Sequence, residues 1–320
     1  MTSTKSVFHK IEFKNCLLNA SGCHCTERKD LLSLYNSKAG GLISKTCSKV
    51  MRDGNPERPR YFQWAAGTIN SMGLPNKGYL YYIYLMQYFP DKPYMISVAS
   101  NYLVDDFNIL LQINQTTKSP RLVEINVSCP NIVGAEQLAY NFMEFGKFIT
   151  NLARNNHLFT NLIIGLKLPP YFDPSHFQKL ASILDPHISS GCIRFLTAIN
   201  SIGNAMVIDT QKETSVIKPK NGLGGLGGDH IKPTALANVW QLYNTFKDRI
   251  PIIACGGVKN GTDAFEHILC GASLVQVGSQ LMLEGPKCFE RIDKELRDIM
   301  KIKGYTYINE FRGKLDINRV

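Results

Sequence analysis

The sequence predicts an α/β protein, namely a single (β/α)8 TIM barrel domain spanning residues 1–320, with long loops over the C-terminal face of the barrel. Eight short apolar runs alternate with segments of helical periodicity, which favours a closed barrel over an open, doubly wound sheet. The runs are almost continuously apolar, which is typical of parallel strands that are buried on both faces. The length of 320 residues also suits such a domain, which commonly reaches about 250 residues or more.

Each predicted strand ends at a small or polar residue. The eight strands occupy residues 16–20, 41–45, 95–99, 122–127, 162–168, 193–199, 250–255 and 273–277. Between them, Thr26 is expected to cap the first helix, residues 138–153 repeat large apolar side chains at helical spacing, and Pro286 is expected to begin the last helix. Residues 46–93 and 201–228 are surplus to this scheme, and loops of such length are usually functional.

The composition indicates a folded protein that stays in the cytoplasm. Hydrophobic residues make up 44% of the chain and charged residues 19%, which excludes a disordered chain. No apolar run approaches the roughly 18 residues of a membrane span, and the first 16 residues contain no signal peptide. Nine cysteines in such a chain suggest reduced thiols. Cys23, His24 and Cys25 lack a second pair at zinc spacing, so no metal site is expected.

The net charge of +10 is compatible with binding to nucleic acid or to a small anion. The charges are spread along the chain without a block of five like charges, so a solvated surface is the preferred interpretation. We therefore expect neither a nucleic acid nor a membrane as partner.

Two lysines end predicted strands, where the chemistry of a barrel is located. Lys45 closes the second strand and Lys167 lies within the apolar run of the fifth. Each lysine alone could extend its ammonium group to water. Two at one barrel mouth favour an anionic or electron-rich ligand, such as a reduced flavin.

Glycines end the last two predicted strands. Gly256 and Gly257 follow the seventh, and Gly278 and Ser279 follow the eighth, which matches the usual phosphate site of such barrels. Either pair alone could be a turn. The glycine-rich residues 221–228 do not follow a strand, which excludes a dinucleotide-binding fingerprint.

Four asparagines lie in loops or at strand ends, where they either form turns or bind a ring with alternating donors and acceptors, such as a pyrimidine. They are Asn70, Asn126, Asn131 and Asn200. Cys129 precedes a proline in the loop after the fourth strand, and an exposed thiol there could act as a base or a nucleophile.

Several unbroken motifs make the chain resemble the class 1A dihydroorotate dehydrogenases, which are soluble flavin enzymes of pyrimidine biosynthesis. The resemblance covers nearly the whole chain. It rests on NASG at 19–22, DGNP at 53–56, INSMGLPN at 69–76, NVSCPN at 126–131, KLPPYFD at 167–173, NSIGN at 200–204, IKPK at 217–220, KPTALAN at 232–238 and DAFEH at 263–267.

The resemblance implies bound FMN, with dihydroorotate stacked on its ring. The flavin ring and ribityl chain would contact Ala20, Ser21, Lys45, Asn126, Lys167 and Ile199, and the phosphate Gly228, Gly256, Gly257, Gly278 and Ser279. The substrate would contact Lys45, Asn70, Met72, Gly73, Leu74, Asn126, Asn131, Asn200 and Ser201. Cys129 would remove a proton from C5 of dihydroorotate while hydride passes from C6 to FMN, giving orotate. Fumarate would then reoxidise FMN and become succinate, and the protein would be a homodimer.

The chain departs from this family in a few places. Relatives usually carry Pro, Lys and Pro at positions 133, 135 and 136, where this chain has Val133, Ala135 and Glu136, and this loop is expected to close less firmly. Ser100 and Ala205 replace usual glycines.

Other classes remain as alternatives. Class 2 enzymes use a serine base and a membrane segment, and class 1B enzymes pass electrons to a partner subunit. A tRNA dihydrouridine synthase would suit the basic charge, but only about eighteen residues follow position 302. A nucleic-acid-binding barrel without catalysis is opposed by Cys129, both lysines and the four asparagines.

Overall fold

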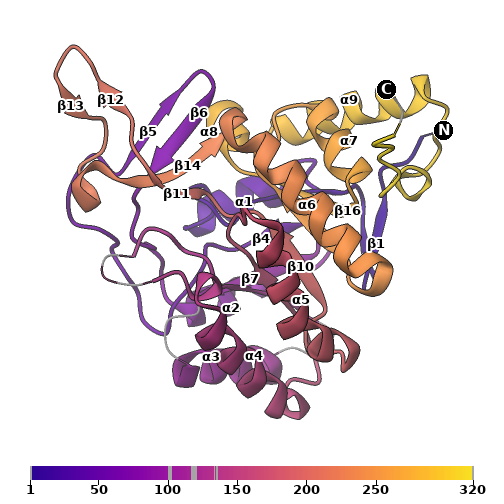
Figure 1. Ribbon diagram of the computed structural model, residues 1–320, viewed down its shortest axis with the longest axis horizontal. Coiled ribbons are helices and arrows are strands. Elements are labelled where there is room, and N and C mark those ends of the chain that lie inside the picture. The colour runs from indigo at the N-terminus through magenta and orange to yellow at the C-terminus, as the bar shows by residue number, and fades with distance from the viewer. Residues whose placement is uncertain (1, 100–102, 117–120, 133, 135, 319–320) are drawn as a thin grey trace.

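The computed structural model describes the chain except for residues 1, 100–102, 117–120, 133, 135 and 319–320 (Figure 1). Eight parallel strands form one sheet in the order β3-β16-β15-β10-β9-β8-β7-β4. An isolated parallel bridge from Leu18 to Gly41 joins the two ends, so the sheet closes into a barrel. All eight predicted strands are confirmed. They are β3 Leu17–Asn19, β4 Leu42–Ile43, β7 Tyr94–Ala99, β8 Arg121–Asn126, β9 Leu162–Lys167, β10 Phe195–Ala198, β15 Ile252–Cys255 and β16 Ala272–Val277.

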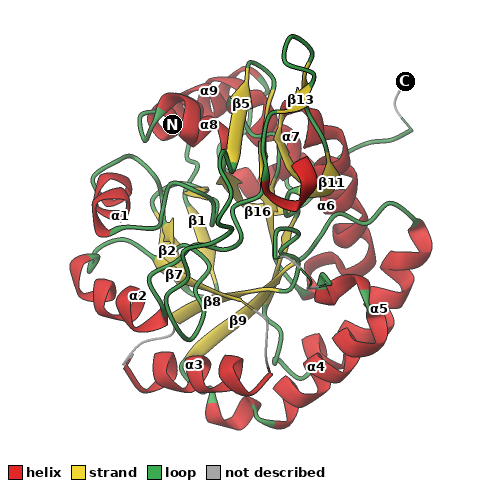
Figure 2. Ribbon diagram, turned by 90° about the vertical axis from the view of Figure 1, so that its left-hand side faces the viewer, coloured by secondary structure: helices red, strands yellow, loops and turns green. Residues whose placement is uncertain are grey.

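Helices surround the barrel and cover its outer face (Figure 2). Their apolar side chains face the strands, as in α4, which buries Phe145, Phe148, Ile149 and Leu152. The helices are α1 Arg28–Tyr35, α2 Tyr79–Leu85, α3 Leu103–Thr116, α4 Phe142–Arg154, α5 Pro174–Ser189, α6 Lys232–Phe246, α7 Gly261–Leu269, α8 Ser279–Glu284 and α9 Cys288–Ile302. Within the described ranges, none of these helices is both long and apolar enough to cross a membrane.

The two long surplus segments fold into further strands instead of loops. An antiparallel sheet in the order β11-β14-β6-β5 lies beside the C-terminal end of the barrel (Figure 1). Its strands are β5 Tyr61–Trp64, β6 Gly67–Asn70, β11 Ile202–Ala205 and β14 Gly224–Gly228, and β12 Ile208–Asp209 pairs with β13 Thr214–Ser215 next to it. The expectation of a loop at 221–228 is therefore wrong for β14. Four of its five residues are glycine, so the strand has no side-chain alternation to reveal it.

Three predicted helix boundaries are wrong. The first helix is capped at Glu27 and not at Thr26, because the Asp30 carboxylate accepts hydrogen bonds from the amides of both residues. The predicted helix 138–153 is divided at Asn141, whose side chain caps α4 by accepting from the Glu144 amide. The last helix begins at Cys288, because Pro286 belongs to the turn before it.

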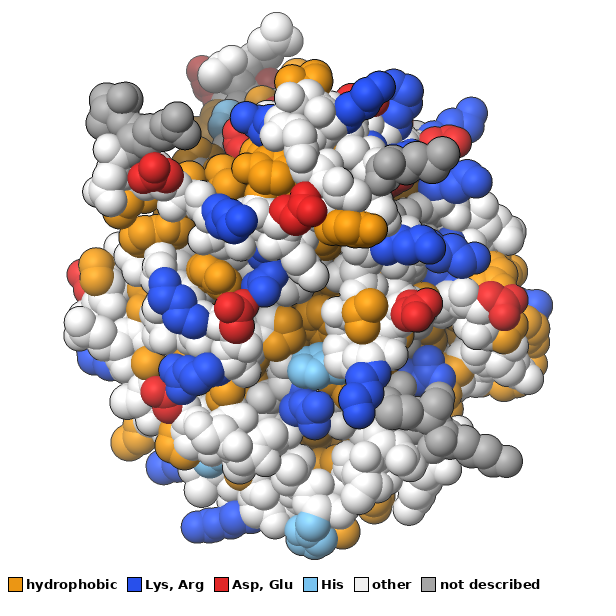
Figure 3. Space-filling view, turned by 90° about the vertical axis from the view of Figure 1, so that its right-hand side faces the viewer, with side chains coloured by type: hydrophobic (Ala, Val, Ile, Leu, Met, Phe, Trp, Pro, Cys, Tyr) orange, Lys and Arg blue, Asp and Glu red, His pale blue; other side chains and the backbone are white. Residues whose placement is uncertain are grey.

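On the face shown in Figure 3, lysine and arginine are dispersed and acidic residues lie among them. Many of them form exposed ion pairs, including Lys294 with Asp298 at 2.8 Å and Arg297 with Asp293 at 2.9 Å, both one turn apart on α9. On this face the net charge therefore forms a mixed, solvated surface.

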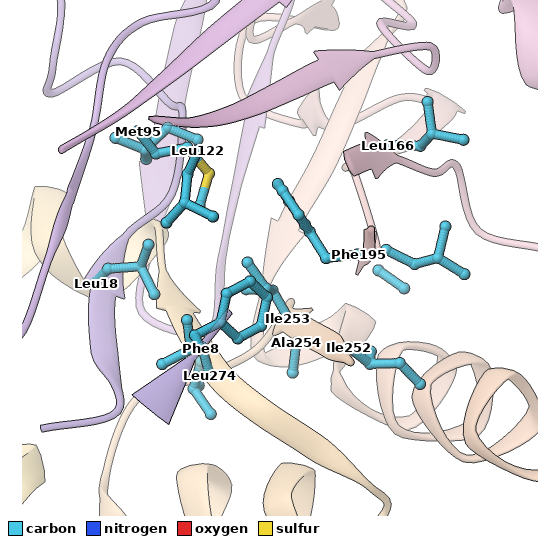
Figure 4. Packing of buried hydrophobic residues seen from close by; sticks show 14 of the residues in the cluster. Phe8, Leu18, Met95, Leu122, Leu166, Phe195, Ile252, Ile253, Ala254 and Leu274 are labelled. Carbon is cyan, nitrogen blue, oxygen red and sulfur yellow. The ribbon is translucent and has the colours of Figure 1, made fainter. Parts of the chain in front are cut away.

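A short hairpin of β1 Ser6–Phe8 and β2 Ile11–Phe13 covers the N-terminal end of the barrel. Phe8 is 1% exposed and packs its ring edge-on against Phe195, with the ring centroids 5.5 Å apart. Ile253 and Leu274 from the barrel strands lie near the same ring (Figure 4). The hairpin therefore closes the apolar end of the barrel, opposite the end where the polar strand termini gather.

We predict that Phe8→Ala lowers the free energy of unfolding by about 3–5 kcal/mol, because it leaves a cavity among packed side chains. Urea unfolding followed by circular dichroism measures the change. Val7 is the matched control, since it lies on the same strand but is 69% exposed, and Val7→Ala should change the free energy by less than about 0.5 kcal/mol. Equal effects of the two substitutions would contradict this role of Phe8.

Candidate active site

An open pocket lies at the C-terminal ends of the barrel strands, and its empty volume of about 1350 Å³ is partly continuous with solvent. It is lined by most of the residues that the sequence singled out: Ala20, Ser21, Lys45, Asn70, Met72, Leu74, Asn126, Cys129, Asn131, Lys167, Ile199, Asn200, Ser201, Gly228, Gly256, Gly257, Gly278 and Ser279. Gly73 does not line the pocket. It adopts a left-handed conformation (φ 72°) and is packed so closely against Asn55 that a Cβ atom would overlap it.

The two pocket lysines that the sequence singled out are both buried. Lys45 is 7% exposed and Lys167 is 5% exposed, so neither extends into bulk water. Lys167 Nζ donates to Gln276 Oε1 at 2.6 Å. The ammonium of Lys45 has no hydrogen-bond or ion-pair partner among the described residues. A buried cation without a partner is costly, and an anionic ligand would offset that cost.

The electrostatic surroundings keep Lys167 charged. Burial alone would lower its pKa, but the neighbouring Cys255 sulfur and Glu124 carboxylate outweigh burial, and the pKa of Lys167 is raised above its ordinary value. The structure therefore contains an ammonium ion at the floor of the pocket at every physiological pH.

Cys129 lies in the loop after β8 and is less exposed than expected. Burial is the largest influence and raises the pKa of its thiol, although the Asn131 amide and the charge of Lys45 act in the opposite direction. Lys45 therefore lowers the pKa of Cys129 by less than burial raises it. The thiol is largely protonated at neutral pH, and its conjugate base becomes available as the pH rises.

The four asparagines form two hydrogen-bonded pairs in the pocket. Asn131 Nδ2 donates to Asn70 Oδ1 at 2.8 Å, and Asn200 Nδ2 donates to Asn126 Oδ1 at 3.2 Å. Asn131 Oδ1 is buried and has no partner within the described part of the chain. These amides therefore hold one another in place and leave at least one acceptor unsatisfied at a site open to a ligand.

The glycines after the last two strands form a cradle. Gly256 and Gly257 have φ angles of 128° and 69°, which favour glycine. Their backbone amides donate no hydrogen bond to any residue that the structure describes. The same end of the pocket is lined by Gly228 from β14, by Gly278 just before α8 and by Ser279, the first residue of α8. Free amides from converging loops suit a phosphate, so the residues present fit a phosphorylated cofactor.

Sequence reasoning missed several polar residues of the pocket and its floor. Thr46 Oγ1 contacts Ser21 Oγ at 2.9 Å and accepts from Asn126 at 3.3 Å. Glu124 lines the pocket although it is fully buried. A charged residue in the middle of the apolar run 122–127 was the signal that could have revealed Glu124. Of the positions that depart from the resembled family, Ser100, Val133 and Ala135 lie outside the described residues.

The fold and the pocket together define a TIM-barrel protein whose strand ends bring buried lysines and free glycine amides into one pocket, a set of groups suited to an anion. A profile of the dihydroorotate dehydrogenase family matches residues 3–300. The chain is 46% identical over 309 residues to dihydroorotate dehydrogenase (fumarate) of Saccharomyces cerevisiae, covering 95% of each protein. It is 44% identical over 320 residues to a homologue from Streptococcus agalactiae, covering 99% of each.

The fold is also similar to that of a solved dihydroorotate dehydrogenase. A structure of the Eimeria tenella enzyme in complex with ferulenol superimposes with a TM-score of 0.74 at 18% identity, over 97% of this chain and 88% of that one. The chain belongs to the dihydroorotate dehydrogenase family.

His267 on α7 contacts the backbone of Gly256, one of the glycines of the cradle. Its Nε2 lies 3.0 Å from the carbonyl oxygen of Gly256, and since a carbonyl only accepts, Nε2 carries the proton. The side chain is fully buried, and burial lowers the pKa of His267 to about 4. Asp263 and Glu266 oppose this shift, but they do not cancel it.

We predict a loss of stability in acid that depends on His267. Between pH 6.5 and 4 the unfolded chain binds a proton at this position that the folded chain does not, so stability falls as the pH falls through this range. The effect approaches about 3 kcal/mol. Urea unfolding at pH 7 and pH 4.5 measures it. His267→Gln keeps an N–H donor for Gly256 and should lose correspondingly less stability on acidification. If the parent and His267→Gln lose the same free energy of unfolding between pH 7 and pH 4.5, the prediction is wrong.

Proposed function

We propose that this protein oxidises dihydroorotate to orotate in de novo pyrimidine biosynthesis, and that it is an FMN-dependent oxidoreductase that uses fumarate as its final acceptor. The observation that carries the proposal is the convergence of Cys129, two buried lysines and two asparagine pairs in one pocket. The relative from Saccharomyces cerevisiae bears the name dihydroorotate dehydrogenase (fumarate), which supports the same reaction here.

FMN is the proposed cofactor. Its phosphate would accept hydrogen bonds from the amides of Gly256 and Gly257, and its ring would lie beside Lys45 and Lys167, with Ala20, Ser21, Asn126 and Ile199 around it. When bound, FMN supplies the acceptor for hydride and passes the electrons on to fumarate. The free amides of the cradle and the charged Lys167 support this assignment.

The asparagine pairs would bind the pyrimidine ring. Dihydroorotate has two ring N–H groups and two carbonyl groups, and the unpartnered Asn131 Oδ1 is an acceptor suited to one N–H. Asn70, Asn126 and Asn200 would provide further amide contacts, and Ser201 and residues 72–74 would border the ring. The free ammonium of Lys45 would pair with the carboxylate of dihydroorotate, or with one of fumarate in the second half-reaction.

Cys129 would act as the general base. Its loop is held on both sides: Lys220 Nζ donates to the carbonyl of Pro130 at 2.5 Å, and Asn55 Nδ2 donates to the carbonyl of Asn131 at 3.2 Å. These bonds fix the backbone next to the thiol, so the thiolate would meet the proton on C5 in a constant position. The proposal includes a cytoplasmic homodimer, which rests on the family resemblance.

We predict that the purified protein carries one FMN per chain and that anaerobic dihydroorotate bleaches its absorbance. Fumarate should then restore the colour, and orotate should slow this step by competition for the same pocket. Rapid-mixing absorbance spectroscopy measures both steps, and the flavin released on denaturation identifies the cofactor. FAD in place of FMN, a bound flavin that dihydroorotate leaves oxidised, or faster reoxidation by a quinone would contradict the proposal. A salt-dependent complex with tRNA in the absence of bleaching would favour a tRNA dihydrouridine synthase.

We predict that Cys129→Ala reduces FMN about 10²–10⁴ times more slowly while retaining the cofactor, because only the base is removed. In the parent, the rate should rise with pH above 7, since the pKa of Cys129 is raised and the thiolate is the active form. Cys129→Ser should remain slow without this rise, because a hydroxyl group is a far weaker acid. Anaerobic stopped-flow reduction across pH 6–10 tests these expectations.

Cys23 provides the matched control, since it is the other cysteine that is only partly buried and it lines the same pocket. Cys23→Ala should keep both the rate and the pH profile of the parent. If Cys129→Ala reduces FMN at the parent rate across the pH range, another residue takes the proton.

A further inference from the structure

A chain of polar side chains crosses the interior of the barrel directly below the pocket. Lys167 on β9 donates to Gln276 Oε1 on β16 at 2.6 Å, and Gln276 Nε2 donates to Glu124 Oε2 on β8 at 3.0 Å. Thr197 Oγ1 on β10 donates to the same carboxylate oxygen at 2.8 Å. An ammonium and a carboxylate are thus connected through one amide, whose orientation is fixed because an ammonium only donates and a carboxylate only accepts.

This chain is isolated from water. Glu124, Thr197 and Gln276 are fully buried, and Lys167 is 5% exposed. Glu124 Oε1 is also buried and has no partner among the described residues, although Glu124 lines the pocket. Two buried charges bridged by an amide, with one carboxylate oxygen unsatisfied, are a poor way to stabilise a barrel, since apolar side chains of similar volume would do so at least as well. The arrangement therefore calls for a functional explanation.

We propose that Glu124 and Gln276 are positioning residues that hold the Lys167 side chain charged and aimed at the floor of the cofactor pocket. The inference rests on the proposed function, in which Lys167 lies beside the flavin ring. Neither residue touches the reacting atoms. Glu124 supplies the counter-charge. Gln276 connects the two charged groups across the barrel, because its amide oxygen accepts from the ammonium and its amide N–H donates to the carboxylate.

The charge of Lys167 depends on these neighbours because burial opposes it. Cys255 on β15, Glu124 on β8 and Cys25 after β3 are the ionisable groups that favour the ammonium form. Lys45 and Lys259 also line the pocket. Cys255 has the largest of these effects and also hydrogen-bonds to Lys167. Glu124 comes next, and it is the carboxylate of the set, connected to Lys167 through Gln276. Removing its charge should therefore release the proton of Lys167 at a lower pH.

The protonation of Lys167 can be measured on the full-length chain after small molecules have been removed. Trace acetic anhydride acetylates only neutral amines, and mass spectrometry of the Lys167 peptide, normalised to exposed lysines such as Lys29, gives the neutral fraction at each pH. At pH 8 we expect Lys167 to react at least about ten-fold faster in Glu124→Gln than in the parent, since one pKa unit changes the neutral fraction ten-fold. The assay needs no flavin, so its failure is distinct from failure of the proposed function.

Two further variants separate charge from packing. Thr197→Val removes the other hydrogen bond to Glu124 but no charge. The acetylation rate of Lys167 in this variant should therefore stay within about two-fold of the rate in the parent. Glu124→Gln combined with Gln276→Glu returns a carboxylate to direct contact with Lys167, and it should restore the slow reaction. If Glu124→Gln does not fold, Gln276→Leu provides the same test, because it removes the bridge and should also accelerate acetylation.

Three results would overturn the proposal. The first is a dependence of Lys167 acetylation on pH that is unchanged in Glu124→Gln. The second is a folded double variant in which Lys167 is acetylated as fast as in Glu124→Gln. The third is the same fast acetylation in Thr197→Val. The first would mean that Lys167 stays charged without Glu124. The other two would mean that disturbed packing, and not the lost charge, exposes the amine.

Discussion

The barrel closes at the seam between β3 and β4 through the side chain of Asn19, and the site depends on this closure. The strand β4 has only two residues, so its backbone pairs poorly with β3. The carboxamide of Asn19 replaces the missing ladder: its Oδ1 accepts from the Ile43 amide at 2.9 Å and its Nδ2 donates to the Ile43 carbonyl at 2.8 Å. Because the sheet is closed, side chains that end strands far apart in the sequence meet around one pocket.

The seam continues into the pocket as a series of hydroxyl and amide contacts. Ser21 Oγ, two residues after Asn19, donates to the Ser44 carbonyl at 2.8 Å and contacts Thr46 Oγ1. Thr46 in turn contacts Ser97 Oγ at 3.0 Å and accepts from Asn126. These contacts join the neighbouring barrel strands β3, β4, β7 and β8 in order, and Lys45 lies among the residues that make them. The geometry of the ligand-facing groups is therefore set by bonds between strands and not by each loop separately.

The sequence predicted the barrel well because its strands are buried and apolar, and it predicted most pocket residues because glycine, lysine and asparagine are unusual where such strands end. It failed where the usual signals are absent. The strand β14 is almost entirely glycine, and β5 and β6 alternate only weakly, so the antiparallel sheet was expected as loops. Glu124 was overlooked because a single charge in an apolar run carries no spacing pattern, and its partners Thr197 and Gln276 lie 73 and 152 residues away in the chain.

The charged side chains occupy two different environments, the surface and the pocket. Surface lysines and arginines are interspersed with carboxylates, as in the series of pairs along α9, so they cancel one another locally. The two buried lysines of the pocket are in a different situation. Lys45 lacks a counter-ion among the described residues, and Lys167 is balanced by Cys255 and by the Glu124 carboxylate on the far side of an amide. In a low dielectric an unbalanced charge acts strongly on any ion that enters the pocket, so the buried lysines favour a small anion there.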